Sequence, residues 1–213
     1  MSTPRERQIA SIARWLRLFI APDQLTELRA IGDRVESQRF RGDQLEAMAA
    51  KAVTFERTAK GVYFVPNPLK PDTKGAAKDA DVLERRWLLV DVDAVRPADV
   101  SATEEERQAA WEVLCRCQSV LETAGMSDAI IGDSGNGWHL CQPIQRPNDD
   151  AARDWCKLLL QTLHKRCSDE RAKVDLRTFN AARVWKLYGT KTGKGLATPE
   201  RPHRHSKIIE DSQ

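Results

Sequence analysis

The 213-residue sequence has no CxxC pair, no long apolar run and no apolar leader, and each absence excludes a class of protein. Without a CxxC pair, a zinc finger or zinc ribbon is not expected. No apolar run approaches the ~20 residues that a membrane-spanning helix needs, so we expect no membrane partner. Residues 1–8 are polar and charged, without the apolar core of a signal peptide. We therefore expect a cytoplasmic protein.

Cysteine is also scarce, with five residues scattered along the chain. Three of them, Cys117, Cys156 and Cys167, fall on the apolar faces of expected helices. We expect them to be small buried hydrophobic residues in a reducing compartment.

Hydrophobic residues make up 41% of the chain and charged residues 31%, which is typical of a globular protein. The length allows one large domain or two small lobes. A polar stretch rich in Lys, Pro and Gly, residues 69–81, is the best candidate boundary. We therefore predict an N-terminal α/β lobe over residues 1–80 and a second lobe over 81–213.

The net charge of +3 conceals a strongly basic segment. Residues 171–207 contain ten Lys or Arg against two acids, which gives +8 there and −5 over the remainder. Such a segment indicates a polyanionic partner, either nucleic acid or a triphosphate. The alternative is a solvated basic tail.

Apolar spacing predicts the secondary structure. Helices are expected near residues 9–20, 43–53, 101–124 and 148–167, and strands near 25–31, 61–65, 87–93, 129–132, 138–141 and 174. From residue 87 onward the order is strand, helix, two strands, helix, strand, which predicts a small sheet backed by two helices.

The central motif is the stretch Trp87–Asp93, WLLVDVD, an apolar run that ends in two acids. Side chains alternate along a strand, so Asp91 and Asp93 share a face, with Cα atoms roughly 7 Å apart. Carboxylates this close repel one another, so a shared proton or a hard divalent cation must compensate. The alternative is two solvated acids where a strand meets a loop.

A glycine-rich turn between two expected strands is the second motif. Residues 133–139, DSGNGWH, place two glycines in three positions, which lets backbone N–H groups face an anion. Ser134 adds a hydroxyl and His139 an imidazole to this candidate phosphate cradle. The alternative is an ordinary β-turn with a structural histidine.

The third motif is Asp175, which follows an apolar residue and opens the basic segment. Its carboxylate can complete a set of oxygen ligands with the acidic pair, or it can be an ordinary loop acid. Arg183 and Lys186 lie three residues apart in the otherwise apolar stretch 181–188, which favours phosphate binding over a solvated face.

In this order the three motifs resemble those of the archaeo-eukaryotic primase superfamily, which includes the primase-polymerases of phages and plasmids. That family has an apolar strand ending in DxD, then serine, glycines and a histidine, then an apolar residue followed by Asp. Here these are WLLVDVD, SGNGWH and VD. TELRAI, GVYFVPNP, FNAARVWKLYGTKTGKG and ERPHRHS extend the similarity over about residues 10–207.

The resemblance implies an α+β fold, the two-lobed primase core, in which an N-terminal α/β lobe accompanies an RRM-like lobe with an antiparallel or mixed sheet backed by helices. The implied site residues are Asp91, Asp93 and Asp175 for catalysis and metal binding; Ser134, Gly135, Asn136, His139, Arg183 and Lys186 for the nucleotide; and Lys191, Lys194, Arg201 and Arg204 for nucleic acid. For residues 201–205, RPHRH, a disordered tail is the alternative.

The implied activity is template-directed nucleotidyl transfer with two Mg²⁺ or Mn²⁺ ions, which makes or extends primers on single-stranded DNA from NTPs or dNTPs. One ion would activate the primer 3′-hydroxyl, and the other would hold the triphosphate and the leaving pyrophosphate. The setting would be replication of a plasmid, phage or mobile element. A replicative helicase, fused or separate, is an expected partner, because relatives often carry a helicase or a zinc module and this sequence has neither.

Two other functions also fit parts of the sequence. Clustered aspartates serve metal-dependent nucleases as well, but a nuclease needs no triphosphate site. A non-catalytic module that binds single-stranded nucleic acid would need an aromatic stacking surface, and little of one is evident where aromatic residues are 6% of the chain.

Overall fold

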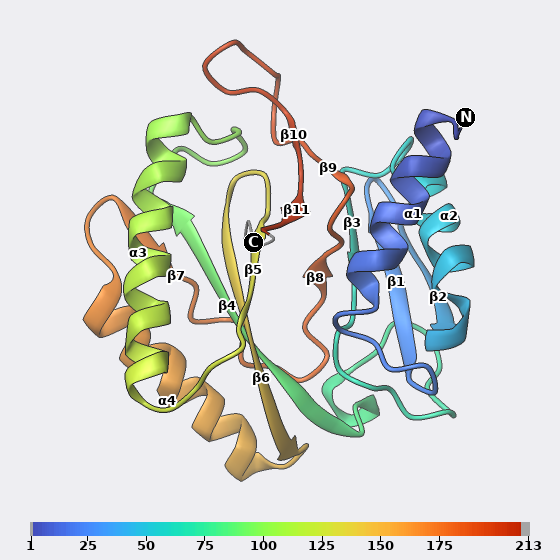
Figure 1. Cartoon of the computed structure of the whole chain (residues 1–213), viewed down its shortest axis with the longest axis horizontal. Helices are drawn as coiled ribbons and strands as arrows, with labels where there is room; N and C mark the ends of the chain where they lie inside the picture. The colour runs from blue at the N-terminus through green and yellow to red at the C-terminus, as the bar shows by residue number, and fades with distance from the viewer. Residues whose placement is uncertain (1, 210–213) are drawn as a thin grey trace.

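The computed structural model describes residues 2–209 and contains two mixed α/β lobes, with helices on the outer side of each sheet (Figure 1). The helices are α1 (Pro4–Leu16), α2 (Leu45–Phe55), α3 (Glu104–Thr123) and α4 (Asp150–Cys167), with 3-10 turns η1 (Gly42–Gln44) and η2 (Asp79–Asp81). The strands are β1 (Leu25–Ile31), β2 (Val35–Arg41), β3 (Gly61–Phe64), β4 (Glu84–Ala94), β5 (Ile130–Asp133), β6 (Gly137–Pro147), β7 (Ala172–Val174), β8 (Trp185–Lys186), β9 (Lys191–Thr192), β10 (Arg204–His205) and β11 (Lys207–Ile208).

The first lobe is an antiparallel sheet of order β2-β1-β3-β8 with α1 and α2 on its outer side. Helix α1 begins with a complete capping box, in which Thr3 and Glu6 satisfy each other's backbone amides. Its apolar face buries Ile12 and Leu16 in a core shared with Met48 of α2. The amphipathic pattern of both helices therefore fixes how they cover the sheet.

The second lobe is an antiparallel sheet of order β11-β5-β6-β4-β7, backed by α3 and α4. Strands β4 to β7 with the two helices follow the order β-α-β-β-α-β, with β6 between β4 and β5, which is the split βαβ arrangement. Helix α3 begins with a capping box formed by Thr103 and Glu106. The fold class predicted from sequence, α+β with two lobes, is confirmed.

The two faces of β4 have different neighbours. Leu88, Val90 and Val92 pack against α3 and α4. Leu89, on the opposite face, belongs to the core of the first lobe, together with Cys141 of β6. The face of β4 that carries Asp91 and Asp93 is therefore turned towards the first lobe, because side chains alternate along the strand.

The structure contains strands that the sequence did not predict, β2 in the N-terminal half and β8 to β11 in the C-terminal segment. Strand β2 was not predicted, because Val35–Arg41 is an edge strand whose side chains are mostly exposed and show no apolar alternation. The first sheet also takes its fourth strand, β8, from the C-terminal half of the chain. The chain thus returns to the first lobe, and the division into 1–80 and 81–213 stays a prediction.

The end of the described chain is ordered. Strand β10 pairs with β9, and β11 pairs with β5 at the edge of the second sheet. Residues 204–205 therefore belong to a strand and do not form a disordered tail. All five cysteines are free, and Cys117, Cys156 and Cys167 are buried as predicted. Within residues 2–209 no helix is both long and apolar enough to cross a membrane.

Candidate active site

Asp91, Asp93 and Asp175 lie on one face of the second sheet. Asp175 directly follows β7, and its amide donates to the Asp91 carbonyl at 2.8 Å, which extends the β4–β7 ladder by one residue. On the other side of β4, His139 of β6 is paired with Asp91. Residues directly opposite each other on antiparallel strands point to the same face. The side chains of His139, Asp91 and Asp175 therefore form a row across three strands.

Two of these carboxylates contact arginines. Asp93 Oδ1 lies 3.2 Å from Nη1 of Arg96, whose side chain is only 6% exposed. Asp175 Oδ1 accepts a hydrogen bond from Arg177 Nε at 3.0 Å, and its Oδ2 lies 3.6 Å from Arg183 Nη2. The Arg177 side chain is 83% exposed, and an ion pair that open to solvent contributes little. Asp175 can therefore change partners readily, whereas the Arg96 side chain that meets Asp93 is almost fully buried.

Asp91 is the electrostatic centre of the site. Burial raises its pKa well above the ordinary value, and the carboxylates of Asp93 and Asp175 raise it further. The charges of Arg183 and Lys194 act in the opposite direction but do not cancel the rise. Negative charge at Asp91 is therefore unfavourable until a proton or a cation arrives.

The donor set fits a divalent cation in its chemistry, but the side chains do not converge on one point. Carboxylate oxygens are the ligands that Mg²⁺ and Mn²⁺ prefer. Among residues 2–209, however, no three His, Cys, Asp or Glu side chains stand close enough together to hold a metal ion. The ion pairs explain this spacing, because Asp93 and Asp175 direct their oxygens to Arg96 and Arg177.

His139 is buried beside Asp91, with its Nε2 3.5 Å from the Asp91 Oδ1 atom. Its Nδ1 lies 2.8 Å from the Tyr188 hydroxyl, and its ring packs on Trp185 at a centroid distance of 4.0 Å. Burial, with a smaller contribution from the charge of Lys186, lowers the pKa of His139 to about 3. His139 is therefore a neutral hydrogen-bonding group at neutral pH.

The turn between β5 and β6 does not present free amides. Gly135, at φ +92°, donates its N–H to Asp133 Oδ1 at 2.7 Å. The Gly137 amide donates to Ser134 Oγ at 2.9 Å, and the Ser134 amide to the Gly137 carbonyl at 3.1 Å. In this structure the amides of Ser134, Gly135 and Gly137 are thus satisfied within the turn, by the Gly137 carbonyl and the side chains of Asp133 and Ser134. Nucleotide contacts by Ser134, Gly135 and Asn136 stay predictions.

A buried ion pair anchors this turn to α3. Asp133 receives two hydrogen bonds from the Arg107 guanidinium, at 2.8 and 3.0 Å. The Arg107 carbonyl in turn accepts from the Trp138 indole at 2.9 Å. Asn136 is tied to the same region, since its Oδ1 accepts from the Ala102 amide at 2.9 Å. Contacts with Arg107 of α3 therefore hold the turn in place.

The similarity of this chain to known proteins lies in its fold. No protein-family model matches the sequence, and no curated protein matches it. The crystal structure of the primase RepB′ matches with a TM-score of 0.56 and 11% identity, over 96% of this chain and 56% of that chain. The catalytic domain of that primase in complex with initiator DNA matches with a TM-score of 0.54 and 11% identity, over 96% of this chain and 85% of that domain. The chain has the fold of a primase catalytic domain.

A polymerase domain shares this fold. The polymerase domain of Mycobacterium tuberculosis ligase D in complex with DNA matches with a TM-score of 0.51 and 15% identity, over 93% of this chain and 79% of that one. The chain spans 56% of the length of RepB′, so it corresponds to part of that protein. The primase-polymerase fold expected from the sequence resemblance is confirmed.

In this primase fold, Lys186 reaches the site region from the first lobe. It lies on β8 and is 6% exposed, and its Nζ donates to the Lys191 carbonyl at 2.8 Å. Burial lowers the pKa of Lys186 to about 7, although the Glu56 carboxylate acts to raise it. Near neutral pH this amine is therefore poised between the neutral and the charged form, and a nearby polyanion would favour the charged one.

We expect Lys186→Met to stabilise the protein most at pH 7 and below, and progressively less up to pH 10. In the unfolded chain the lysine stays protonated up to about pH 10.5, whereas in the folded protein it loses its proton near pH 7. The unfolded state thus binds more protons between these values, and the stability of the native protein rises with pH. Urea unfolding of both proteins from pH 6 to 10 measures the difference; a constant difference would contradict the assignment.

The remaining basic residues fall into two groups. Lys191 and Lys194 are exposed, and Lys194 acts electrostatically on Asp91. Arg201 forms a two-point ion pair with Glu106, with both distances 2.7 Å. Arg204 donates to the Ala102 carbonyl at 2.8 Å. The two arginines therefore fasten the C-terminal segment to the start of α3, and the exposed lysines are better placed to meet nucleic acid.

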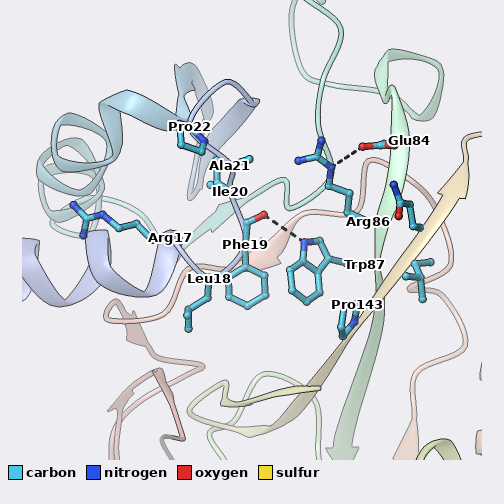
Figure 2. A pocket seen from close by; sticks show the side chains of 12 residues that line it. Arg17, Leu18, Phe19, Ile20, Ala21, Pro22, Glu84, Arg86, Trp87 and Pro143 are labelled. Atoms are coloured by element: carbon cyan, nitrogen blue, oxygen red, sulfur yellow. Dashed lines mark hydrogen bonds and ion pairs between the residues drawn. The ribbon is translucent and has the colours of Figure 1, made fainter. Parts of the chain in front are cut away.

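A cavity of 490 Å³ lies between the lobes on the same face of β4 (Figure 2). Phe19 and its neighbours line one side, and Trp87, Arg86 and Pro143 line the other. The Trp87 indole N–H donates to the Phe19 carbonyl at 3.4 Å, so the two lobes are tied together here. The predicted site residues are not among those that line this cavity.

Sequence reasoning missed several residues that contact the predicted site. Arg96 and Arg177 follow the acids by three and two residues, but nothing in the sequence shows that they turn back to them. Trp185 and Tyr188 lie in the stretch 179–195, which belongs to the resemblance but carried no role for either residue. A Trp and a Tyr in an apolar run indicate buried hydrogen bonds, because the indole N–H and the hydroxyl need partners when buried.

Proposed function

We propose that the protein is a nucleotidyltransferase that makes or extends primers on single-stranded DNA. The proposal rests on one observation: His139, Asp91 and Asp175 stand in a row on the interlobe face of a primase fold. The related RepB′ catalytic domain was solved with initiator DNA, and the ligase D polymerase domain with DNA. DNA is therefore the proposed template here.

The acids would serve as the ligands of divalent cations. Asp91, Asp93 and Asp175 would together hold Mg²⁺ or Mn²⁺, two ions by the proposal. When bound, such ions neutralise phosphate charge and lower the pKa of a coordinated hydroxyl. Cation binding would also offset the repulsion among the three carboxylates that raises the Asp91 pKa. This repulsion therefore favours binding of a cation.

The other side chains would hold the nucleoside triphosphate. In the proposed reaction, the primer 3′-hydroxyl oxygen bonds to the α-phosphorus while the bond from that phosphorus to the bridging oxygen breaks. The hydroxyl proton passes to solvent, and pyrophosphate leaves. His139, neutral and buried, would donate a hydrogen bond to a phosphate oxygen. Arg183 and Lys186 would bring positive charge, and the Lys186 amine would take up a proton as the anion arrives. Such catalysis is positioning and electrostatics, without covalent chemistry by the protein.

A single incubation tests this function. The protein is mixed with an unprimed or a primed single-stranded template, labelled NTPs or dNTPs, and Mg²⁺ or Mn²⁺, and the products are sized on a gel. We expect metal-dependent products longer than the primer, or new oligonucleotides without one. Shortened template would instead indicate a nuclease, and DNA binding without any product would indicate a non-catalytic module.

Arg177→Ala is expected to tighten Mn²⁺ binding by about two- to five-fold. Arg177 holds Asp175 in an exposed ion pair, and the cation must displace it to reach that carboxylate. Calorimetric titration of Mn²⁺ into both proteins measures the change. The matched control is Arg153→Ala, which breaks ion pairs of similar exposed type with Asp150 and Asp154 on α4. Weaker Mn²⁺ binding in Arg177→Ala would contradict the competition.

A further inference from the structure

Three buried aromatic side chains, Trp185, Tyr188 and His139, form a connected series of contacts that ends at Asp91. The Trp185 indole Nε1 donates to the Tyr188 hydroxyl at 3.1 Å, and this hydroxyl lies 2.8 Å from His139 Nδ1. The His139 Nε2 atom, on the other side of the ring, is 3.5 Å from Asp91 Oδ1. Trp185, Tyr188 and His139 are each less than 5% exposed, so water does not compete for these contacts.

The donors in this series can be assigned by counting hydrogens. Trp185 Nε1 can only donate, so the Tyr188 oxygen accepts from it. The single Tyr188 hydrogen then has two candidate acceptors, His139 Nδ1 at 2.8 Å and the Cys141 sulfur at 3.8 Å. The nitrogen is much closer and is the stronger acceptor. His139 Nδ1 is therefore bare, and its proton is on Nε2.

The Asp91 end of the series is compatible with the same assignment. When Asp91 is ionised its carboxylate only accepts hydrogen bonds, so it then favours an N–H over a lone pair on the neighbouring Nε2. The Tyr188 hydroxyl thus selects the tautomer, and an ionised Asp91 is compatible with it. In many histidines the hydrogen bond made by one ring nitrogen decides whether the other nitrogen, which faces the reacting groups, carries the proton.

We propose that Tyr188 is a positioning residue, whose hydroxyl, oriented by Trp185, fixes His139 as a hydrogen-bond donor towards Asp91 and the triphosphate. The functional part of this inference rests on the proposed nucleotidyl transfer. In the opposite tautomer a lone pair at Nε2 would face the phosphate oxygens and repel them. Tyr188 would therefore act on nucleotide affinity through His139, without touching the substrate.

The Tyr188 hydroxyl occupies the space that a side chain at position 132 would fill. Gly132 of β5 is paired with His139, and a Cβ atom added there would overlap the Tyr188 ring and its hydroxyl. The Tyr188 ring is 1% exposed and cannot swing away. Gly132 is therefore the position that lets Tyr188 reach His139.

The test combines a spectroscopic and a kinetic measurement on Tyr188→Phe. Long-range ¹H–¹⁵N spectra of the labelled protein at pH 7 show which nitrogen of His139 carries the proton, with His139→Asn used to assign the signal. We expect Nε2–H in the native protein, and a mixture of tautomers in Tyr188→Phe. The KM for the nucleotide should rise about ten-fold, with a smaller change in kcat. Cys141→Ala, which removes the other candidate acceptor of the Tyr188 hydrogen, should change neither measurement.

Each outcome decides the matter. A proton on Nδ1 in the native protein, or an unchanged tautomer in Tyr188→Phe, would overturn the assignment. A changed tautomer with an unchanged KM would overturn the positioning role. The spectra do not depend on any synthesis, so a protein that makes no product would contradict the proposed function and still report on the tautomer.

Discussion

Replacement of Asp91 by asparagine is expected to reduce nucleotide incorporation by at least about 100-fold, the scale seen when a key electrostatic group is removed. The same change should raise the thermal midpoint of the metal-free protein by about 2 °C or more. Both effects have one cause: Asp91 is a partly buried carboxylate, 23% exposed, between two others, and its charge is unfavourable without a cation and required with one. Primer extension and thermal unfolding, each in EDTA and in Mn²⁺, measure the two effects.

The gain in stability has a defined pH dependence. In the folded protein the Asp91 pKa is well above its ordinary value of 3.8, so the folded state holds this proton more tightly than the unfolded state. Native stability is therefore lost as the pH rises from about 4 through the folded pKa. Asparagine does not titrate, so its advantage should appear over that window and persist at neutral pH.

The matched control for Asp91→Asn is the same substitution at Asp33, an exposed residue in the turn between β1 and β2. We expect Asp33→Asn to leave both incorporation and the thermal midpoint close to those of the native protein. Full incorporation by Asp91→Asn would refute the catalytic role of the acid. A lower midpoint of the metal-free variant would refute the repulsion.

The second large effect is expected at Gly132. An alanine there would force its Cβ into the buried Tyr188 ring, and overpacking of this kind costs about 3 kcal/mol. In the Gly132→Ala/Tyr188→Leu double variant the obstructing ring is gone, so the two costs should not add. We expect the double variant to be more stable than the sum of the single changes predicts by about 1 kcal/mol or more.

Urea unfolding of the four proteins in this cycle measures the coupling. Gly75→Ala serves as the control, because Gly75 has φ +64° and open space around its Cα. Its cost should come only from backbone strain, about 1 kcal/mol. Additive effects at Gly132 and Tyr188 would show that the two positions do not constrain each other, and would weaken the account of the Tyr188–His139 contact.

Local sequence patterns were sufficient for much of the fold. The period-2 alternation of WLLVDVD predicts that Asp91 and Asp93 share a face, and in the structure that face of β4 is turned towards the first lobe. The apolar spacing predicts α3, because this signal lies within the helix itself. Strand β2 has no such local signal, since it is a polar edge strand stabilised only by pairing with β1.

The candidate site was predictable only in part. Asp175 could be named as a third acid, and register between β4 and β7 brings it beside Asp91. The contacts that decide what each group does depend on tertiary packing. Tyr188 meets His139 from a separate lobe, and Asp133 satisfies the Gly135 amide within the turn. No spacing in the sequence encodes either contact.

The central claim is that Asp91, Asp93 and Asp175 hold a divalent cation, and calorimetric titration of Mn²⁺ into the nucleotide-free protein tests it most directly. The account predicts measurable binding to the native protein, and binding that is at least about ten-fold weaker in Asp91→Asn. Equal binding to the two proteins, or no binding to the native one, would contradict it.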